Sequence, residues 1–260
     1  VGRVIYGDKK EKSSVSQNAE TVLEVRHLSA GKEVKDVSFS LRKGEILGFA
    51  GLMGAGRTET ARAIYGADPK DSGEIFVRGK KVRIRQPEQA VKNGICYLSE
   101  DRKRYGLLLI KSVAENSALA SIDNFTKAGW INDKSITKAA AETNALLRTK
   151  TPSMYQELKN LSGGNQQKVI VARWLIKNSD IFIFDEPTRG IDVGAKSEMY
   201  ELMEKLAAQG KSIIMISSEL AEIQRLSDRV IVMCEGRITA ELDIADATQE
   251  EIMKYATMRN

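Results

Sequence analysis

The chain has 260 residues, of which 42% are hydrophobic and 29% are charged, so it can form one large α/β domain or two small ones with a buried core. This composition excludes a disordered chain and a coiled rod. There are 40 Lys and Arg against 35 Asp and Glu, a formal net charge of +5, with the two signs interspersed along the sequence. That charge is a mild indication of anionic partners and nothing stronger.

The cysteines, the single histidine and the apolar runs exclude several classes of protein. Cys96 and Cys234 lie far apart in apolar runs, which gives no disulfide framework or metal-ligand spacing and predicts a reducing cytosol. All apolar runs are far shorter than the ~20 residues of a membrane-spanning helix. His27 is the one histidine, so His-based triads are excluded, and we expect it to be structural or solvated. The sequence starts at Val1 without a signal pattern, and we expect a piece of a longer protein.

The first elements in chain order are a linker and three strands. Residues 7–20 are polar and have no hydrophobic period, so residues 1–20 are predicted to be a linker from a preceding domain. The compact domain is predicted to cover residues 21–260. Alternating and β-branched residues predict strands at 22–26, 37–41 and 45–50, with Val37, Phe39 and Leu41 on one face.

A glycine-rich loop, a helix, a hairpin and a helical region come next. The helix is predicted at 58–65, and the hairpin at 73–84 turns at Gly79. Strand signals vanish between residues 101 and 160, and we predict a helical subdomain over about 101–165. One apolar helical face there consists of Ile136, Ala139, Ala140, Thr143, Leu146 and Leu147.

The last third of the chain alternates strands with helices. Helices are predicted at 165–177, 196–209 and 219–225, and strands at 181–184, 212–217 and 229–233. Such alternation is typical of a mainly parallel sheet with helices on both faces. The predicted fold class is therefore α/β, with an antiparallel β portion near the start and a helical subdomain.

The loop GLMGAGRT has the spacing of a phosphate-binding loop between a strand and a helix. Glycines let consecutive N–H groups turn toward phosphate oxygens at the helix N-terminus. The candidate binding residues are Gly51, Gly54, Ala55, Gly56, Arg57 and Thr58, with Thr58 placed to ligate Mg²⁺. A lone match leaves open a glycine-rich turn that binds nothing. Arg57 replaces the usual lysine, and one misplaced charge-assisted contact costs about 1.5–3 kcal/mol.

Two further motifs support a nucleotide site. The apolar strand IFIFDE ends in Asp185, expected to position Mg²⁺, and Glu186, expected to polarise water against a γ-phosphate. A buried strand capped by surface acids is the alternative. LSGGNQQK begins a helix with Ser162, Gly163 and Gly164, whose N–H groups suit a phosphate, although Ser162 could act only as an N-cap. All three motifs in this order favour a nucleotide-binding protein.

Together these motifs resemble a known family. The order GLMGAGRT, YLSEDRK, LSGGNQQK, FDEPTRGID and ISSEL is similar to an ABC-type ATPase domain, with LSGGNQQK as the signature motif. More narrowly, the chain resembles the C-terminal half of tandem ATPases that power monosaccharide importers of the ribose, galactose and xylose type. The resemblance covers Thr21 to about Glu251. VGR at residues 1–3 resembles the end of the first half.

The resemblance implies roles for these residues and a set of partners. Residues 51–58 would be Walker A, Asp185 and Glu186 Walker B with the catalytic acid, and Ile191 and Asp192 part of the D-loop. Residues 162–164 would contact ATP held by the N-terminal ATPase half of the same polypeptide. The implied cofactors are ATP and Mg²⁺. The implied partners are transmembrane permease subunits and, indirectly, a periplasmic sugar-binding protein, at the cytoplasmic face of the membrane.

Departures from the family pattern predict an asymmetric pair of sites. Glu100 replaces a glutamine that senses Mg²⁺, Ser218 replaces a γ-phosphate-contacting histidine, and residues 28–38 lack an adenine-stacking ring. With Arg57, four features of one site are weakened while the signature is intact. We therefore expect a degenerate site on this chain and a competent site completed by its signature. The alternative is ordinary hydrolysis supported by Glu186.

Two segments and two other protein classes complete the predictions. SEDRKRYG, residues 99–106, is either a solvated charge cluster or, as the resemblance implies, a contact with membrane subunits. LLLI, residues 107–110, suits either such a contact or the core. A soluble ABC ATPase acting on ribosomes would normally keep the lysine. A DNA-repair ATPase would need a long coiled coil, and no sustained heptads occur here, so no nucleic-acid partner is expected.

Overall fold

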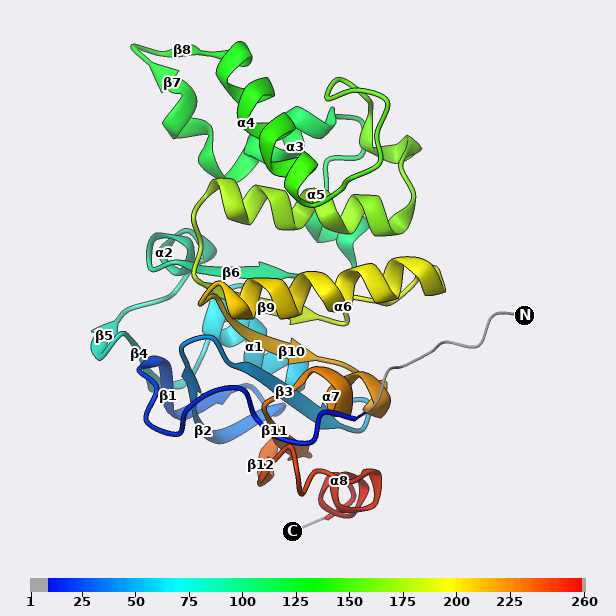
Figure 1. Cartoon of the computed structure of the whole chain (residues 1–260). Coiled ribbons are helices and arrows are strands. Elements are labelled where there is room, and N and C mark those ends of the chain that lie inside the picture. Colours follow the sequence, from blue (N-terminus) through cyan, green and yellow to red (C-terminus); the bar gives the residue numbers. More distant parts are fainter. Residues whose placement is uncertain (1–8, 259–260) are drawn as a thin grey trace. The chain divides into compact units, whose positions relative to one another are not determined.

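The computed structural model describes residues 9–258, which fall into two compact units (Figure 1). The first unit takes in the chain up to residue 97, residues 180–186 and the chain from residue 203 onward. The second unit takes in residues 98–179 and 187–202. Each unit therefore joins segments that are distant in sequence, and each holds some of the predicted site residues.

The first unit is built on a six-stranded sheet whose strands come from distant parts of the chain. In spatial order the strands are β12 (Arg237–Asp243), β11 (Arg229–Cys234), β3 (Ile46–Gly51), β10 (Ser212–Ile216), β9 (Ile181–Asp185) and β6 (Ile95–Leu98). β11, β3, β10 and β9 run parallel, and β12 is antiparallel to β11. β9, β10 and β11 are buried at every residue, as expected of parallel strands covered on both faces.

The parallel register brings three predicted site segments to one edge of this sheet. Ile216 at the end of β10 pairs with Asp185 on one side and with Phe49 on the other. The glycine-rich loop follows β3, Glu186 follows β9, and the next residues after Ile216 follow β10. Ligands of open α/β sheets bind outside the carboxyl ends of the strands, so this edge is the place to look for a site.

A four-stranded antiparallel sheet forms the other β part of the first unit. Its order is β2 (Val34–Arg42), β1 (Thr21–Ala30), β4 (Ser72–Val77) and β5 (Lys80–Val82). Val37, Phe39 and Leu41 are buried on one face of β2, which confirms the alternation read from the sequence. The hairpin of β4 and β5 turns at Gly79 (φ 72°), also as predicted. His27 is exposed, which confirms the expectation of a solvated residue.

Helices of the first unit follow the predicted bounds closely where the sequence is periodic. They are α1 (Arg57–Tyr65), α2 (Pro87–Lys92), α7 (Leu220–Leu226) and α8 (Gln249–Ala256). The sequence pattern indicates α1 and α7, but not α2, α8, β6 or β12, of which most are too short to show a period. Cys96 and Cys234 are buried free thiols, which agrees with the absence of a disulfide framework. Among residues 9–258 we find no helix with the length and apolar character that crossing a bilayer requires.

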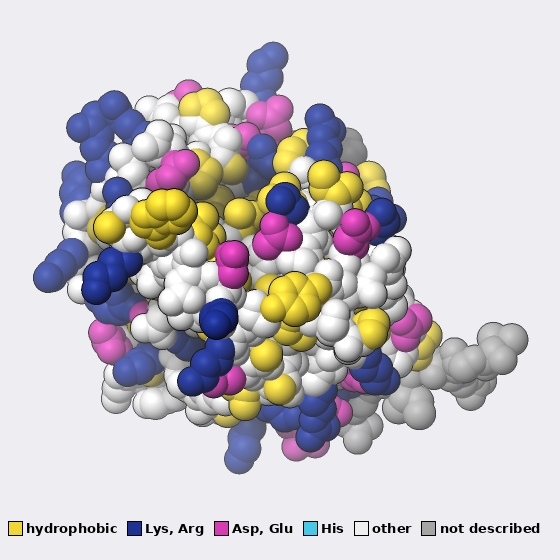
Figure 2. Space-filling model, turned by 90° about the horizontal axis from the view of Figure 1, so that it is seen from above, with side chains coloured by type: hydrophobic (Ala, Val, Ile, Leu, Met, Phe, Trp, Pro, Cys, Tyr) yellow, Lys and Arg dark blue, Asp and Glu magenta, His cyan; other side chains and the backbone are white. Residues whose placement is uncertain are grey.

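The second unit is mainly helical. It contains α3 (Val113–Ala118), α4 (Asp133–Leu146), α5 (Gly163–Ile176), a π-helix η1 (Arg102–Gly106), 3₁₀-helices η2 (Leu119–Phe125) and η3 (Leu158–Asn160), and the start of α6 (Val193–Ala208). Arg173 of α5 holds two other segments of this unit, because its guanidinium donates to the carbonyls of Asn116 (2.8 Å) and Gly106 (2.7 Å). Seen from above, cationic, acidic and hydrophobic side chains are mixed over the face shown, with no sector of one sign (Figure 2).

The predicted apolar face of α4 is wrong at Leu146, whose side chain is 81% exposed. Leu146 and Leu147 are neighbours in sequence and lie about 100° apart around a helix, so one face cannot bury both. Asn144 takes the buried place instead. Its Nδ2 donates to Ser117 Oγ and to the carbonyl of Ala140, both at 2.9 Å, so the amide nitrogen is satisfied at a position that periodicity alone would place in solvent.

The prediction that strands are absent between residues 101 and 160 is also wrong in one place. β7 (Thr126–Lys127) and β8 (Trp130–Ile131) form a short antiparallel hairpin. Its turn residues Ala128 (φ 50°) and Gly129 (φ 82°) both have positive φ, as the type I′ hairpin turn requires. All four strand residues are exposed, so no buried face imposes an alternating pattern on the sequence.

β1 begins at Thr21, the residue at which the compact domain is predicted to start, and the domain boundary itself stays a prediction. That residues 1–20 link this domain to a preceding one stays a prediction. The VGR sequence at residues 1–3 lies outside the described residues.

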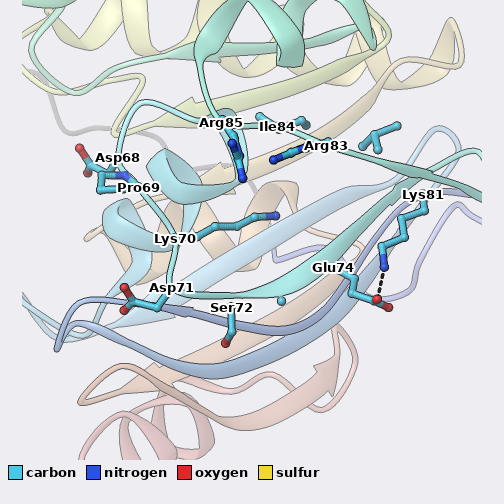
Figure 3. Close-up of a pocket in the computed structure, with 12 residues that line it drawn as sticks. Asp68, Pro69, Lys70, Asp71, Ser72, Glu74, Lys81, Arg83, Ile84 and Arg85 are labelled. Atoms are coloured by element: carbon cyan, nitrogen blue, oxygen red, sulfur yellow. Dashed lines mark hydrogen bonds and ion pairs between the residues drawn. The ribbon is translucent and has the colours of Figure 1, made fainter.

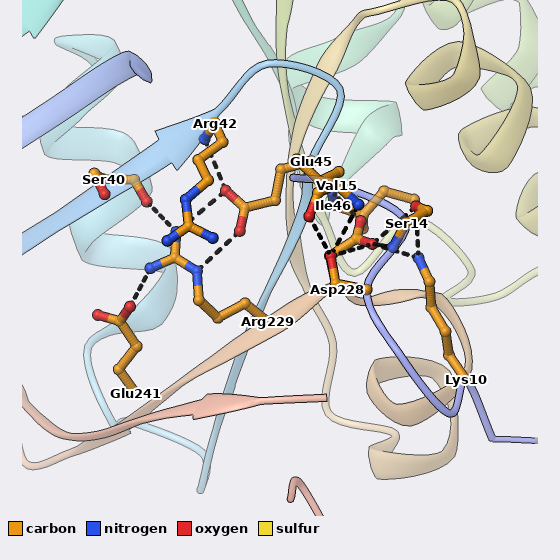
Figure 4. Close-up of polar contacts among 11 residues, drawn as sticks. Lys10, Ser14, Val15, Ser40, Arg42, Glu45, Ile46, Asp228, Arg229 and Glu241 are labelled. Carbon is orange, nitrogen blue, oxygen red and sulfur yellow. Dashed lines mark hydrogen bonds and ion pairs between the residues drawn. The ribbon is translucent and has the colours of Figure 1, made fainter. Parts of the chain in front are cut away.

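Residues 9–20 contain no helix or strand, yet part of this segment is bound to the first unit through Asp228 (Figure 4). One carboxylate oxygen of Asp228 accepts hydrogen bonds from Lys10 Nζ (2.7 Å) and from the N–H of Ser14 (2.9 Å). The other oxygen accepts from the N–H of Ile46 at the start of β3 (2.9 Å). Asp228 therefore fastens the polar N-terminal segment to the sheet.

The environment of Asp228 favours its charged form. Burial alone would raise its pKa, but hydrogen bonds from Lys10 and from the N–H groups of Ile46 and Ser14 hold the pKa below its ordinary value. In the adjacent buried pair, the guanidinium of Arg229 donates to both carboxylate oxygens of Glu45 (2.9 and 3.1 Å; Figure 4).

We predict that Asp228→Asn lowers the free energy of unfolding at pH 7 by about 3 kcal/mol, because an uncharged amide would face several donors. The contribution of Asp228 is complete above the ordinary aspartate pKa and is lost as pH falls through the lower pKa of the folded state. The difference between the two proteins should therefore shrink below about pH 4. Urea unfolding at several pH values measures it, with exposed Asp123→Asn as the control. Equal losses for the two variants would contradict the prediction.

Candidate nucleotide site

The glycine-rich loop connects β3 to α1 with a backbone that only glycine fits at positions 51 and 56. Gly56 precedes α1 with φ 97°, and a Cβ there would lie 2.3 Å from the carbonyl oxygen of Glu33. Gly236 extends this close contact, because its N–H donates to the carbonyl of Ala55 (3.0 Å). No side chain caps α1, so the N–H groups of its first turn are left for another acceptor. Gly51 and Gly54 belong to the same loop. A glycine-rich loop that leads into an uncapped helix start is the geometry that phosphate binding by backbone N–H groups needs.

Asp185 at the end of β9 is the most constrained carboxylate of this region. Thr58 Oγ1 donates to one of its oxygens (3.1 Å) and the Tyr97 hydroxyl donates to the other (2.6 Å). Burial raises the pKa of Asp185, and these two hydrogen bonds oppose the rise. Burial beside Asp185 also raises the pKa of Tyr97, so the phenol keeps its proton and remains a donor.

The guanidinium of Arg57 is bound by the protein itself. Its Nη1 donates to the carbonyl of Ser217 (2.6 Å), and its Nη2 lies 3.9 Å from a carboxylate oxygen of Glu186. Burial lowers the pKa of Arg57, and the charges of Glu186 and Asp185 oppose that change. Arginine nevertheless remains cationic in proteins. The cation of the loop is therefore held at the ends of β9 and β10.

Glu186 has an unusual backbone conformation that its neighbours hold in place. Its φ of 49° lies in the left-handed region, which costs a residue other than glycine about 1–3 kcal/mol. Its N–H donates to the carbonyl of Ile216 (2.9 Å), and the Ser218 hydroxyl donates to its carboxylate (3.1 Å). The carboxylate thus lies between Arg57 and Ser218, with its side chain 12% exposed.

The first unit brings together the sequence-predicted residues of the loop, the acidic pair and Ser218. Sequence reasoning missed Tyr97, which donates to Asp185 from β6. The signal available was the apolar run Ile95–Leu98, which has the composition of a buried strand and lies just before residues 100–103, the EDRK segment. A tyrosine in such a strand needs a partner for its hydroxyl, and the adjacent acidic strand offers one.

The oxygen atoms near Asp185 suit Mg²⁺. This ion prefers oxygen ligands, keeps several waters and commonly binds through one or two protein oxygens plus substrate phosphates. Thr58 Oγ1 and a carboxylate oxygen of Asp185 lie 3.1 Å apart and supply such a pair. Within residues 9–258, no group of three or more His, Cys, Asp or Glu could hold a metal ion, so an all-protein metal cage is not available there.

In the second unit, the start of α5 presents Ser162 to solvent. Ser162 occupies the N-cap position, but its side chain makes no capping hydrogen bond, so the alternative that it serves only as an N-cap is wrong. Instead its hydroxyl accepts from the side chain of Asn165 (2.9 Å). Gly163 is half-buried and Gly164 is buried, where a Cβ would lie 2.5 Å from that of Ala195. Gly164 therefore has a packing role, and a contact with nucleotide stays a prediction.

The side chain of Arg102, in the EDRK segment, forms hydrogen bonds within the second unit. It donates to the carbonyls of Arg189 (3.0 Å) and Gly190 (3.3 Å). A Cβ on Gly163 would lie 2.6 Å from the same guanidinium. Arg102 thus joins the first residues of α5 to the segment after the acidic strand, a role that the solvated-cluster alternative did not include.

Two further predicted residues lie in the second unit. Glu100 forms an ion pair with Arg189. Asp192 accepts a hydrogen bond from the N–H of Ala195 (3.0 Å) at the start of α6. Both carboxylates are therefore engaged within their own unit.

Comparison with known proteins assigns the family. Residues 34–189 match the family model described as ABC transporter. The chain belongs to the ABC transporter family. Its resemblance to an ATP-binding domain of that family is thereby confirmed, and so is the predicted α/β fold class of the P-loop NTPase type.

Curated relatives of this ABC transporter domain are named as sugar import proteins. The putative ribose/galactose/methyl galactoside import ATP-binding protein 2 of Burkholderia cenocepacia is 56% identical over 260 residues, which is 100% of this chain and 51% of that protein. The ribose import ATP-binding protein RbsA of Clostridium tetani is 49% identical over 241 residues, 92% of this chain and 48% of that protein. The chain spans about half the length of the curated relatives it matches.

Solved structures agree on the fold. The ATP-binding cassette MJ1267 of an ABC transporter superposes with a TM-score of 0.77 at 21% identity, covering 92% of this chain and 99% of that one. The cassette MJ0796, solved as a dimer in a post-hydrolysis state bound to ADP and Pi, gives a TM-score of 0.71 at 22% identity, covering 85% and 98%. At these identities the likeness concerns the fold alone.

We predict that Tyr97→Phe destabilises the domain by about 1.5–3 kcal/mol at pH 7, because Asp185 loses a charge-assisted hydrogen bond. The pKa of Asp185 in the folded state is already raised and should rise further. A raised carboxyl pKa destabilises the folded state only once pH exceeds the ordinary value of about 4. Because the native carboxyl ionises only above that value, the loss should grow as pH rises through the raised pKa of native Asp185. Chemical unfolding measures it. Tyr155→Phe, at a residue 75% exposed, is the control, and a Tyr97→Phe loss no larger than this control would contradict the prediction.

Proposed function

We propose that this chain is the second ATP-binding domain of an ABC importer that takes up a monosaccharide, acting at the cytoplasmic face of the membrane. Support comes from similarity to proteins named for ribose and galactose import, which covers 92% to 100% of this chain and about half of each relative. The partners would be the N-terminal ATPase half of the same polypeptide, transmembrane permease subunits and, indirectly, a periplasmic sugar-binding protein. ATP binding and hydrolysis would drive transport, and the domain itself would not contact the sugar.

In this proposal each residue near the loop has a role toward ATP and Mg²⁺. N–H groups of residues 51–58 would hold the phosphates, and Thr58 and Asp185 would hold Mg²⁺, which neutralises phosphate charge when it is bound. Glu186 would accept a proton from the attacking water. Tyr97 would act as a positioning residue, because its hydrogen bond fixes the orientation of the Asp185 carboxylate.

The proposal that the two nucleotide sites differ depends on one observation, which is that the protein itself binds the Arg57 guanidinium. A phosphate-loop cation must reach the β- and γ-phosphates, but this guanidinium donates to the Ser217 carbonyl and faces Glu186. Binding ATP would require one of these contacts to break. Breaking such a contact leaves a buried polar group without its partner, and this cost offsets part of the free energy gained when Arg57 contacts phosphate. We infer a degenerate site on this chain, to which Glu100 and Ser218 add two further departures.

The signature motif would instead serve the site of the N-terminal half. Ser162 is exposed, and its side chain does not cap the backbone of α5. Its hydroxyl oxygen accepts from the side chain of Asn165, which leaves the hydroxyl proton to donate to a phosphate held by another domain. Arg102 supports this arrangement, because it fixes the segment beside Gly163. Permease contact would involve the segment after EDRK, where Leu108 and Ile110 are exposed.

In the full-length tandem protein, Ser162→Glu should lower ATP hydrolysis at least about tenfold, because a carboxylate would face the phosphate held by the other half. The exposed position keeps the domain folded. Ser153→Glu, also exposed and also in the second unit, is the matched control and should leave the rate unchanged. Steady-state phosphate release measures both.

The same assay separates the two sites. Glu186→Gln in the full-length protein should leave most of the hydrolysis rate, because this chain's own site contributes little. A large loss with Glu186→Gln and none with Ser162→Glu would show that this chain carries the competent site, and the asymmetry would be wrong.

For the isolated domain we predict that Arg57→Lys binds MgATP at least about tenfold more tightly than the native protein. A lysine ammonium is compact and makes neither the Ser217 contact nor the Glu186 contact through a planar fork. Isothermal titration measures the two affinities. Arg62→Lys, five residues along α1 and outside the loop, is the control. Equal affinities for native protein and Arg57→Lys would show that Arg57 is not what weakens the site.

A further inference from the structure

The first unit has a second cavity, of about 630 Å³, that the nucleotide site does not use (Figure 3). Its walls are residues 68–74, between the end of α1 and β4, and residues 81–85, which finish β5 and lead to α2. Neither the glycine-rich loop nor the acidic pair lines it.

Three cations line this cavity without a partner. Lys70 reaches into it from one wall, and Arg83 and Arg85 point toward Lys70 from the other (Figure 3). In the part of the chain that the structure describes, none of the three side chains donates a hydrogen bond or forms an ion pair. Like charges that converge in this way repel one another unless an anion lies between them.

The backbone explains how two arginines come to face the same side. Ile84 lies between them and is buried, with 1% of its surface exposed. It packs against the end of α1, where a Cβ on Gly66 would lie 2.9 Å from its side chain. Side chains alternate in direction along a chain leaving a strand, so anchoring Ile84 inward turns Arg83 and Arg85 outward together.

The acidic residues of the cavity are already engaged elsewhere. Asp68 accepts two hydrogen bonds from Arg62 (2.6 and 2.7 Å). Asp71 accepts from a backbone N–H at the end of β1 (2.8 Å), and Glu74 pairs with Lys81 (Figure 3). None of these acids forms an ion pair with Lys70, Arg83 or Arg85, so no carboxylate of the walls occupies the place between the three cations.

The environment of Lys70 agrees with a missing anion. This residue is half-buried, and burial together with the charge of Lys81 lowers its pKa, although the charge of Glu74 opposes that change. A bound anion would reverse that effect, because an opposite charge nearby favours the ammonium form.

We propose that this cavity binds a phosphate-bearing anion, held by the guanidinium groups of Arg83 and Arg85 and the ammonium of Lys70. Guanidinium forks bind two phosphate oxygens at once, and three cations suit a group with more than one negative charge. The source is either a soluble phosphate compound or the headgroup of an anionic phospholipid, and the two share this chemistry.

Acetylation of lysines followed by mass spectrometry tests the proposal at the cavity itself, so binding at the glycine-rich loop cannot imitate the result. The probes are inorganic pyrophosphate, phosphatidylcholine vesicles with and without phosphatidic acid, and polyglutamate. We expect pyrophosphate or the phosphatidic acid vesicles to slow acetylation of Lys70 at least about fivefold, and not that of Lys80, which is exposed and outside the cavity.

Substitutions provide the second arm. Arg83→Gln and Arg85→Gln should each raise the probe concentration that half-protects Lys70 from acetylation at least about tenfold. Lys80→Gln should leave that concentration unchanged. The arginines are exposed and unpaired, so the melting temperatures of all three variants should match the native value. Protection by pyrophosphate identifies a soluble ligand, and protection only by phosphatidic acid vesicles identifies a headgroup. No protection by either, or equal protection by polyglutamate, would overturn the proposal.

Discussion

The hydrogen-bonded carboxylate of Asp185 is the interaction on which the candidate site depends. It lies at the end of a fully buried strand, where an isolated charge would be costly, and it is kept there by donors from two other elements. Thr58 comes from the helix after the glycine-rich loop, and Tyr97 comes from the edge strand β6. The same three residues therefore fix the loop, the acidic strand and the sheet edge relative to one another within the first unit.

Arg57 and Glu186 show how that arrangement limits the chemistry. A lysine at position 57 has no guanidinium fork, so it would not make the two contacts that Arg57 makes with the carbonyl of Ser217 and the carboxylate of Glu186. The arginine contacts both, and it thereby helps to hold Glu186 in its strained left-handed conformation. Arg57 is therefore part of the packing around the site, whereas Ser162 of the signature motif is exposed in the second unit.

Charge is used differently in the two regions that face possible anions. Around the loop, backbone N–H groups and one tethered cation are available, whereas the cavity beside β4 and β5 presents three side-chain cations that form no ion pair with the acids of its walls. The first arrangement suits a ligand that lies along a helix N-terminus, and the second suits a compact group surrounded by side chains. Both belong to the first unit, but they are lined by different residues.

The sequence by itself determined the motifs, their order and most regular elements, because glycine spacing, buried strands and helical periods are local patterns. Residues such as Gly56, Asp185 and Ser162 could be predicted for that reason. Tertiary structure alone decided which donors meet a given acceptor, as Tyr97 does at Asp185 and Arg102 does at residues 189–190. It also decided that Asn144 rather than Leu146 is buried in the helical core, and that Arg83 and Lys70 line the same cavity. These contacts join residues far apart in the chain or on competing faces of a helix, and no local pattern carries that information.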